Sequence, residues 1–254
     1  MRRVFITGAS AGIGAALARH YAGAETSIGL FARRRDLLEK LASGLPGRTE
    51  IYPSDIADPT AIAAAAQDFI SRFGAPDLVV ANAGLSVGTH GDDMQDIEKL
   101  RRVLSVNVTG LAATLAAFAP SMRAAGSGTL CGVASVAGFR GIPGAGAYSA
   151  SKAAAIAWLE ALRNELAGSG VSVVTICPGY IDTPMTQVNK YRMPFLISAD
   201  DAAERFARAI ESKRRLAVIP WQMAVVSSLM RAMPGWLYDR LAARAPRKPR
   251  DLPL

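Results

Sequence analysis

The 254-residue sequence has few of the side chains that build metal sites and disulfides. It contains two cysteines, Cys131 and Cys177, and two histidines, His20 and His90. Both cysteines fall in apolar segments typical of buried strands, where a cysteine packs as a small apolar residue. A metal site needs several ligands together, and no such cluster stands out. We therefore expect neither a metal centre nor a disulfide.

Aromatic residues make up 7% of the chain, and no array of them suggests a platform for nucleic-acid bases. The net charge of +8 is therefore expected to reflect a solvated basic surface, not a nucleic-acid-binding protein. The uncharged run 104–122 contains Pro120 and several polar residues, which favours a buried helix over a membrane span. The first strand pattern begins almost at Met1, so we expect no secretory leader and a cytoplasmic location.

The chain instead shows a regular alternation of strand and helix patterns. Short apolar segments predict strands at 3–7, 26–32, 49–53, 77–81, 128–134, 171–177 and 215–219. Helical patterns lie between them, including 59–73 and 147–167. This alternation predicts an α/β fold, a doubly wound parallel sheet of about seven strands with helices on both faces. Residues 1–220 are expected to form this domain, with ligands bound beyond the carboxyl ends of its strands.

Two local motifs suggest chemistry. A glycine-rich turn, Thr7 to Gly14, follows the first strand and opens a helix, an arrangement that points backbone N–H groups at a phosphate. Its G-x-x-x-G-x-G spacing could also belong to a simple tight connection. Further along, Tyr148 and Lys152 lie four residues apart in a helical segment and so share one face. A nearby ammonium favours the phenolate and lowers the pKa of a tyrosine, which makes this pair a candidate acid/base device.

With these motifs the chain resembles the short-chain dehydrogenase/reductase family, in its ordinary, non-extended branch. The resemblance covers about Arg2 to Pro220 and rests on several motifs in the family's order. They are the glycine turn, Asn82-Ala83-Gly84, Asn107, Ser135, Tyr148 with Lys152, and Pro178-Gly179. The resemblance implies a Rossmann-like fold and an enzyme that transfers a hydride between a nicotinamide cofactor and a carbonyl or alcohol.

The resemblance also implies roles for single residues. Tyr148 would give a proton to the carbonyl oxygen, or take it from an alcohol, and Lys152 would favour the phenolate and bond the nicotinamide ribose. Ser135 would polarise the substrate oxygen, and Asn107 would hold a water that links Lys152 to solvent. Structural alternatives are a backbone-bonding serine and a helix-kink asparagine. The implied cofactor-binding residues are Gly8, Ser10, Gly12, Ile13, Gly14, Arg33, Arg34, Asp55, Ile56, Asn82, Ala83, Gly84, Tyr148, Lys152, Pro178, Gly179, Ile181 and Thr183.

The end of the second strand bears on the choice of nicotinamide cofactor. Arg33-Arg34-Arg35 stands where NAD-preferring relatives carry an acidic residue. A guanidinium suits a 2′-phosphate by charge and by its planar set of donors, so NADP(H) is favoured over NAD(H). Ala11 departs from the basic residue of many NADP-using relatives. Asp55 would contact the adenine by resemblance, or else serve as a turn or capping residue.

The substrate residues are expected in loops beyond the strand ends, and their character is largely apolar. A hydrophobic ketone or aldehyde is the substrate class they favour, under a lid formed by 183–197. The candidates are Ser86, Val136, Ala137, Phe139, Ile142, Tyr180, Met185 and Tyr191, with Arg140 a weaker candidate for an anion.

The last segment, 221–254, lies outside the resemblance. Its uncharged start at 221–230 and its tryptophans suit a helical extension that packs on the domain, covers the substrate entrance or forms a subunit contact, or else touches a membrane surface. The resemblance implies a homodimer or homotetramer. Its basic residues are Arg231, Arg240, Arg244, Arg247, Lys248 and Arg250. A catalytically silent NADP(H)-sensing protein on the same fold is the alternative to an enzyme, although a sensor would not need Ser135, Tyr148 and Lys152 together.

Overall fold

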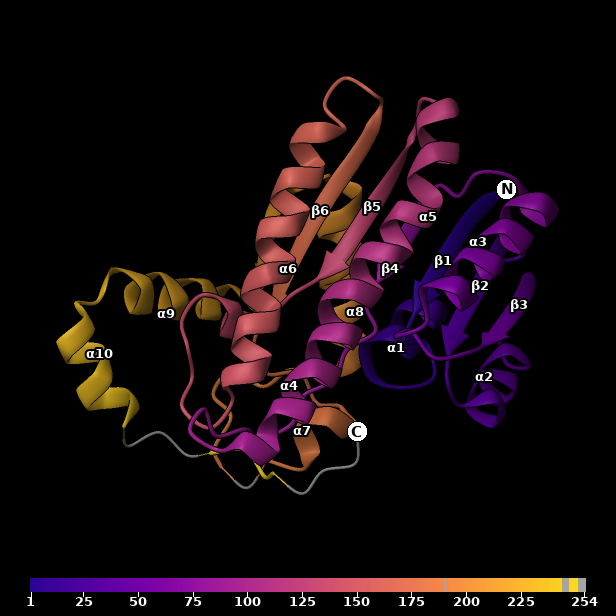
Figure 1. The fold of residues 1–254 in the computed structure, drawn as a ribbon. Helices are drawn as coiled ribbons and strands as arrows, with labels where there is room; N and C mark the ends of the chain where they lie inside the picture. Colours follow the sequence, from indigo (N-terminus) through magenta and orange to yellow (C-terminus); the bar gives the residue numbers. More distant parts are fainter. Residues whose placement is uncertain (190, 244–246, 251–254) are drawn as a thin grey trace.

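The computed structural model describes residues 1–189, 191–243 and 247–250 of the chain. A seven-stranded parallel sheet runs through it in the order β3-β2-β1-β4-β5-β6-β7 (Figure 1). The strands are β1 (Arg2–Thr7), β2 (Thr26–Ala32), β3 (Arg48–Pro53), β4 (Leu78–Ala81), β5 (Gly128–Val133), β6 (Val171–Pro178) and β7 (Leu216–Ile219). The α-helices are α1 (Gly12–Tyr21), α2 (Arg35–Ala42), α3 (Pro59–Phe73), α4 (Ile97–Leu104), α5 (Gly110–Ala124), α6 (Gly146–Glu165), α7 (Pro184–Gln187), α8 (Ala199–Glu211), α9 (Trp221–Ala232) and α10 (Gly235–Ala242).

Helices cover both faces of the sheet, as the alternating pattern predicts. On one face, α1, α2 and α8 bury Leu17, Leu38 and Phe206 against the strands. On the other face, α3, α5 and α6 lie in front of the sheet in Figure 1 and pack around Phe5 of β1 and Phe118 of α5, whose rings are 4.6 Å apart. Helices thus bury both apolar faces of the sheet. The order of the strands creates the cleft described below.

The fold expected from the sequence is confirmed, and its boundaries differ by one or two residues. The predicted strand 77–81 begins at Leu78, and the Asp77 carboxylate before it accepts from the backbone N–H of Arg3 in the adjacent β1 at 2.7 Å. The predicted helix 147–167 is α6, which ends at Glu165.

The uncharged run of the sequence belongs to a helical stretch, 94–124, that is long and apolar enough to cross a membrane by length and composition. The most apolar part of this stretch is 50% buried. Leu115 and Phe118 on this stretch are fully buried against the sheet, so its packing is that of a core helix.

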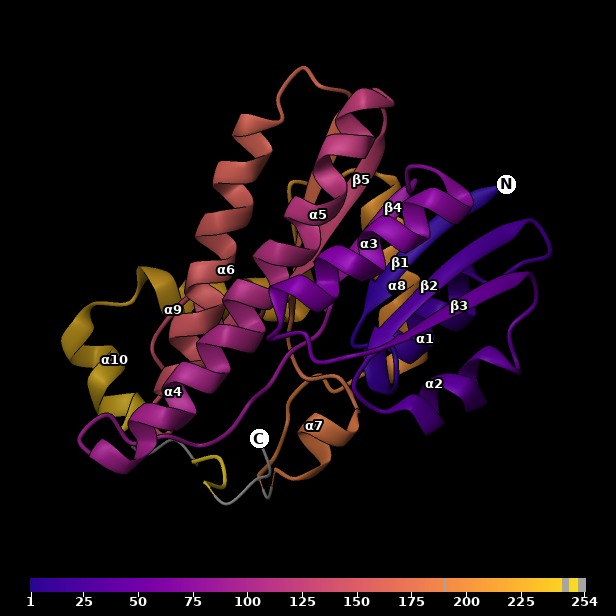
Figure 2. The same ribbon diagram turned by 45° about the vertical axis from the view of Figure 1, so that its right-hand side comes forward.

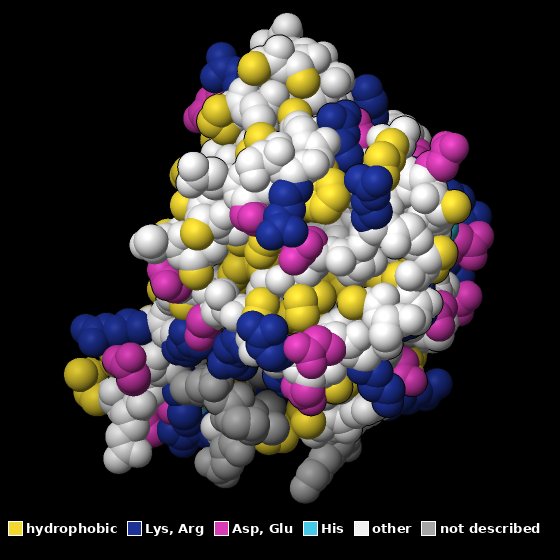
Figure 3. All heavy atoms as spheres, turned by 90° about the vertical axis from the view of Figure 1, so that its right-hand side faces the viewer, with side chains coloured by type: hydrophobic (Ala, Val, Ile, Leu, Met, Phe, Trp, Pro, Cys, Tyr) yellow, Lys and Arg dark blue, Asp and Glu magenta, His cyan; other side chains and the backbone are white. Residues whose placement is uncertain are grey.

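Charged side chains do not form one basic patch on the face drawn in Figure 3, where Lys and Arg are interspersed with Asp and Glu. The C-terminal helices α9 and α10 lie to one side of the sheet, away from β3 (Figures 1 and 2). Beyond them, the described segment 247–250 returns toward α7 in Figure 2. Arg244 lies outside the described residues.

Candidate active site

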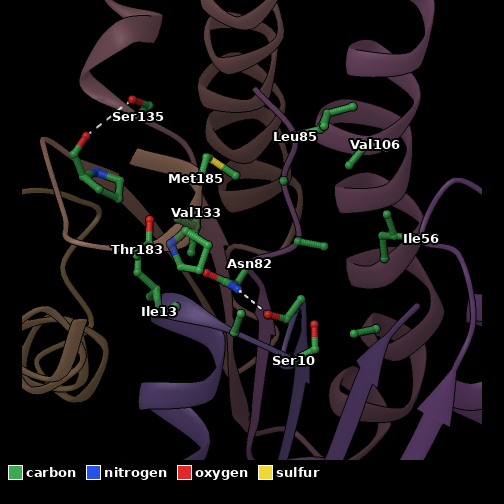
Figure 4. Close-up of a pocket in the computed structure, with 18 of the residues that line it drawn as sticks. Ser10, Ile13, Ile56, Asn82, Leu85, Val106, Val133, Ser135, Thr183 and Met185 are labelled. Atoms are coloured by element: carbon green, nitrogen blue, oxygen red, sulfur yellow. Dashed lines mark hydrogen bonds between the residues drawn. The ribbon is translucent and has the colours of Figure 1, made fainter. Parts of the chain in front are cut away.

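A cleft of about 320 Å³ opens at the carboxyl edge of the sheet, a volume in the range of small-molecule sites (about 300–1,000 Å³). It lies where the strand order reverses between β1 and β4, the position expected for ligands in such sheets. Figure 4 shows loops from both halves of the sheet converging on it. The predicted cofactor residues that line it are Gly8, Ser10, Gly12, Ile13, Arg33, Arg34, Asp55, Ile56, Asn82, Ala83, Gly84, Tyr148, Lys152, Pro178, Gly179, Ile181 and Thr183.

Gly14 is the predicted cofactor residue outside that lining. A Cβ built on it would lie 2.3 Å from the Gly8 carbonyl oxygen and 2.7 Å from Asn82 Nδ2. Such approaches are shorter than van der Waals contact, so only glycine lets the first turn of α1 pack this closely on the ends of β1 and β4. Gly14 therefore positions the helix, and Gly8 and Gly12 form the surface of the cleft.

The start of α1 fits the phosphates of a dinucleotide. Gly8 and Gly12 adopt φ of +69° and +54°, a region that favours glycine, and these bends turn the backbone toward the cleft. No side chain caps the first N–H groups of α1, and no acidic residue occupies its first turn. Uncapped N–H groups and the positive end of the helix dipole suit an anion at this point.

Asn82 holds the two halves of the cleft together. Its side-chain amide donates to the Thr7 carbonyl at 3.0 Å, and its backbone N–H donates to the Thr7 hydroxyl at 3.1 Å. The loop after β4 is thereby fixed to the end of β1 (Figure 4). The sequence predicts that Asn82 contacts the cofactor. The structure shows that its amide and its backbone N–H also join the loop after β4 to the end of β1.

Tyr148 and Ser135 meet at the opposite end of the cleft. Tyr148 lies in the first turn of α6 and is half-buried, whereas Ser135 follows β5 and is 7% exposed. Burial raises the pKa of Tyr148, and a hydrogen bond with Ser135 lowers it by a smaller amount. The Ser135 hydroxyl also caps a 3₁₀ turn by accepting from the Ala137 N–H at 3.2 Å. The backbone-bonding alternative for Ser135 therefore coexists with its contact to Tyr148.

Lys152 lies one turn after Tyr148 on α6 and is 3% exposed. Its Nζ donates to the Val133 carbonyl at 2.8 Å and lies 5.7 Å from the centre of the Tyr148 ring. Burial lowers the pKa of Lys152 to about 8. The sequence predicted that Lys152 lowers the pKa of Tyr148, but the net shift of the Tyr148 pKa is upward, with burial as its largest cause. The reason is that desolvation of the phenol outweighs its hydrogen bond with Ser135, while the Lys152 ammonium is held on a backbone carbonyl.

Asn107 lies in a π-helical turn, Ser105–Thr109, between α4 and α5. Such turns are often found at functional sites. Its Oδ1 accepts from the Leu85 N–H at 2.7 Å, and its Nδ2 donates to the Leu85 carbonyl at 2.9 Å. A Cβ built on Gly84 would lie 3.5 Å from Asn107 Oδ1 and 3.6 Å from Lys152 Nζ. Glycine at position 84 thus leaves the space between these two polar atoms clear of a side chain.

The basic residues after β2 differ in their placement. Arg33 and Arg34 are exposed and line the cleft, and Arg34 donates to the Ser10 hydroxyl at 3.0 Å. Arg35 starts α2 and pairs with Glu39 at 3.5 Å, so it belongs to the helix surface.

Asp55 forms an ion pair with Arg102, a cleft residue that was not predicted from the sequence. Its carboxylate accepts from the Ala57 N–H at 2.9 Å and pairs with Arg102 of α4 at 2.6 Å. These hydrogen bonds lower the pKa of Asp55 against the opposing effect of burial. Arg102 itself lines the cleft, but its place beside Arg101 in a charged helical pattern gave no signal of that position.

The predicted substrate residues are dispersed around the mouth of the cleft. Met185 lines it, as do Leu85 and Val106 (Figure 4). The rings of Tyr180 and Tyr191 pack at 6.4 Å, and burial raises the pKa of Tyr191 to about 12. Of the other candidates, Ile142 lines a second, shallower hollow, Phe139 lies under Arg231, Val136 and Ala137 form the 3₁₀ turn after Ser135, and Ser86 is bonded to Lys248.

Arg140, the weaker candidate for an anion, holds the C-terminal helices. It donates to the carbonyl oxygens of Met230 and Met233, each at 3.2 Å, and lies 4.2 Å from the centre of the Tyr238 ring. These contacts fix the end of α9 against the loop after β5. Arg140 therefore holds the C-terminal helices in place and does not line the cleft.

Comparisons with known proteins agree with this geometry. A family model described as short chain dehydrogenase matches residues 2–193. An oxidoreductase of Myxococcus xanthus is 37% identical over 246 residues, which cover 96% of this chain and 97% of that protein. A 3-ketoacyl-(acyl-carrier-protein) reductase from Brucella melitensis, complexed with NADH, matches with a TM-score of 0.78 and 25% identity over 85% of this chain and 94% of its own. An alcohol dehydrogenase from Thermococcus sibiricus, complexed with 5-hydroxy-NADP, matches with a TM-score of 0.75 and 28% identity over 86% and 96%.

Proposed function

The chain belongs to the short-chain dehydrogenase/reductase family, and from that premise we propose that it is an NADP(H)-dependent oxidoreductase that interconverts an apolar ketone or aldehyde and its alcohol. One observation carries the proposal. Tyr148, Ser135 and Lys152 share the end of a cleft whose other end has an uncapped helix start suited to phosphates. A binding protein without catalysis would not require the phenol, hydroxyl and ammonium at that end.

The proposed mechanism follows from the protonation states of these groups. A bound nicotinamide supplies the hydride to the carbonyl carbon. Tyr148 donates the proton to the carbonyl oxygen, and its raised pKa keeps the phenol protonated at neutral pH. The Ser135 hydroxyl, which donates to the Pro178 carbonyl at 3.4 Å in the structure, turns to donate a hydrogen bond to the same oxygen, where negative charge develops. In oxidation of the alcohol the hydride transfer and the single proton transfer both run in reverse.

Lys152 and Asn107 are proposed to help replace the proton that Tyr148 donates. An ammonium has three donors, and Lys152 uses one on the Val133 carbonyl, which leaves two for the cofactor ribose and a water. We propose that a water occupies the space beside Gly84, between Asn107 Oδ1 and Lys152 Nζ, and returns a proton from solvent after each reduction.

The proposed preference for NADP(H) rests on Arg33 and Arg34. Both line the cleft beyond β2, where a dinucleotide with its pyrophosphate at α1 would carry its adenosine ribose. Neither position offers a carboxylate to a ribose 2′-hydroxyl, whereas two guanidinium groups offer donors to a 2′-phosphate.

The proposed substrate class rests on the apolar lining around Leu85, Val106 and Met185 (Figure 4). We expect NADPH oxidation with medium-chain aliphatic and alicyclic ketones or aldehydes at a kcat/KM at least about tenfold above that for pyruvate, because apolar burial of one or two methylenes is worth about 1–3 kcal/mol. The measurement is loss of NADPH absorbance against a panel of such carbonyl compounds. Turnover of small oxo-acids alone would contradict the substrate class.

We also propose a cytoplasmic homodimer or homotetramer. The surface of α9 and α10 supports such a contact, because Trp221, Val225 and Leu229 are spaced one turn apart on α9 and are 68%, 51% and 64% exposed. An exposed apolar stripe of this kind typically marks an interaction surface. Contact with a membrane surface through the same stripe is the alternative.

A further inference from the structure

The described C-terminal segment 247–250 lies across the loops at the substrate end of the cleft. The Gly88 N–H donates to the Pro249 carbonyl at 2.9 Å. Arg250 pairs with Asp93 and, at 3.0 Å, with Asp96, whose side chain is 2% exposed. A backbone hydrogen bond and a double ion pair thus attach this segment to the loop between β4 and α4.

The segment presents the ammonium of Lys248 to the mouth of the cleft. Nζ of Lys248 donates to the Ser86 hydroxyl at 2.9 Å and to the Met185 carbonyl at 3.3 Å. Met185 lines the cleft, and Ser86 directly follows Leu85, which lines it as well. Figure 4 shows Met185 between Ser135 and Leu85, on the side of the cleft that we assign to substrate.

Lys248 has no counter-ion in this position. Both of its acceptors are neutral, and no carboxylate lies within ion-pair distance of it among the residues that the structure describes. Burial lowers the pKa of Lys248 to about 8, which still leaves most molecules charged at neutral pH. A partly buried cation with two neutral acceptors gains free energy when an anion reaches it.

We propose that Lys248 is a specificity-determining residue that binds a carboxylate on the substrate, at the end remote from the reacting carbonyl. This inference deepens the proposed function and rests on it: the substrate has an apolar body between its carbonyl and its carboxylate. In the sequence, Lys248 is one of several basic residues in the C-terminal segment. Coverage of the substrate entrance by this segment is one of the alternatives that the sequence leaves open, but the contacts of Lys248 could not be predicted from it.

The close approach of the segment depends on Gly88. A Cβ built on Gly88 would lie 2.3 Å from the Lys248 carbonyl oxygen, a distance that side chains do not reach. Gly88→Ala is therefore expected to displace the segment without touching the groups that bind or react. Gly91→Ala is the matched control, because a Cβ at Gly91 has no neighbour within 4 Å among the described residues.

An equilibrium test uses octanoate and octanamide as an anionic and a neutral probe of the same length, neither of which can give up a hydride to NADP⁺. Calorimetry on the NADP⁺-saturated protein is expected to show that Lys248→Met weakens octanoate binding about 10–100-fold, the effect of losing one charge-assisted hydrogen bond. Lys248→Arg is expected to recover part of the affinity. Gly88→Ala should weaken octanoate binding and Gly91→Ala should not. Thermal unfolding of each variant checks that the fold is intact.

Equal octanoate affinity in the parent and Lys248→Met would overturn the inference, as would an equal loss for octanoate and octanamide. Turnover separates this result from the proposed function. With a keto-acid and its methyl ester as substrates, the parent is expected to prefer the acid, and Lys248→Met is expected to lose that preference. Oxidation of NADPH with the ester but no preference for the acid contradicts the Lys248 inference alone. No oxidation with either compound contradicts the proposed function.

Discussion

Replacing Tyr148 by phenylalanine is expected to lower kcat for carbonyl reduction by about 10²–10⁴, the usual contribution of a general acid. The ring keeps its place in the first turn of α6, and the phenol that donates the proton is lost. NADPH binding is expected to remain, since the glycine turn, Arg33 and Arg34 are untouched. Steady-state kinetics together with a fluorescence titration of NADPH separate the two effects.

Tyr180→Phe is the matched control for this prediction. Tyr180 is a second partly buried tyrosine near the cleft, and its ring packs on Tyr191 at 6.4 Å. Removal of its hydroxyl leaves the acid/base group in place, so kcat should change by less than about tenfold. If Tyr148→Phe kept more than a tenth of the parent rate, another proton donor would have to be found.

The pH dependence of the parent enzyme tests the same pair of residues. The pKa of Lys152 is lowered to about 8, so its ammonium is present below pH 8 and is lost as the pH rises through that value. The kcat/KM for NADPH, which reports groups of the free enzyme, is therefore expected to be highest below pH 8 and to fall above it. A kcat/KM for NADPH that rose as the pH passed through 8 would contradict a requirement for the Lys152 cation.

The double variant Arg33→Ala with Arg34→Ala is expected to weaken NADPH binding about 10–100-fold or more. Each charge-assisted hydrogen bond to a phosphate contributes about 1.5–3 kcal/mol, and about 1.4 kcal/mol corresponds to a factor of ten. NADH lacks the 2′-phosphate, so its affinity should change by only a few-fold. The ratio of the two dissociation constants, measured by titration, is the informative quantity.

Arg35→Ala provides the control, because it removes one positive charge from the same run at a residue that pairs with Glu39 on the surface of α2. It should leave the ratio of NADPH to NADH affinity unchanged within about twofold. Equal losses of NADPH and NADH affinity in the double variant would show that Arg33 and Arg34 do not read the 2′-phosphate.

The strands, the helices and the general position of the cleft could be predicted from the sequence. Apolar runs of strand length separated by helical patterns determine a parallel sheet, and residues just after the strand ends must then meet at one edge. Gly8, Asn82 and Ser135 are brought to that edge for this reason, whereas Tyr148 reaches it from the first turn of α6.

The features that could not be predicted depend on packing between distant segments. Gly14 has the spacing of a cofactor residue, but its role became clear only from its closeness to Gly8 and Asn82. The pKa of Tyr148 depends on how deeply the phenol is buried, which no spacing reveals. Lys248 reaches Ser86 across 162 positions of sequence, a contact set by the path of the C-terminal segment.

The central claim is that the cleft carries out direct hydride transfer to a carbonyl carbon, with Tyr148 as the proton donor. Mass spectrometry of the product formed from a medium-chain ketone and NADPH deuterated at C4 tests it most directly, with one deuterated face of the nicotinamide at a time. The account predicts an alcohol with one deuterium on the carbinol carbon, from one face only, for the parent and at a greatly reduced rate for Tyr148→Phe. Binding of NADPH without any transfer of deuterium to a carbonyl compound in the panel would contradict it.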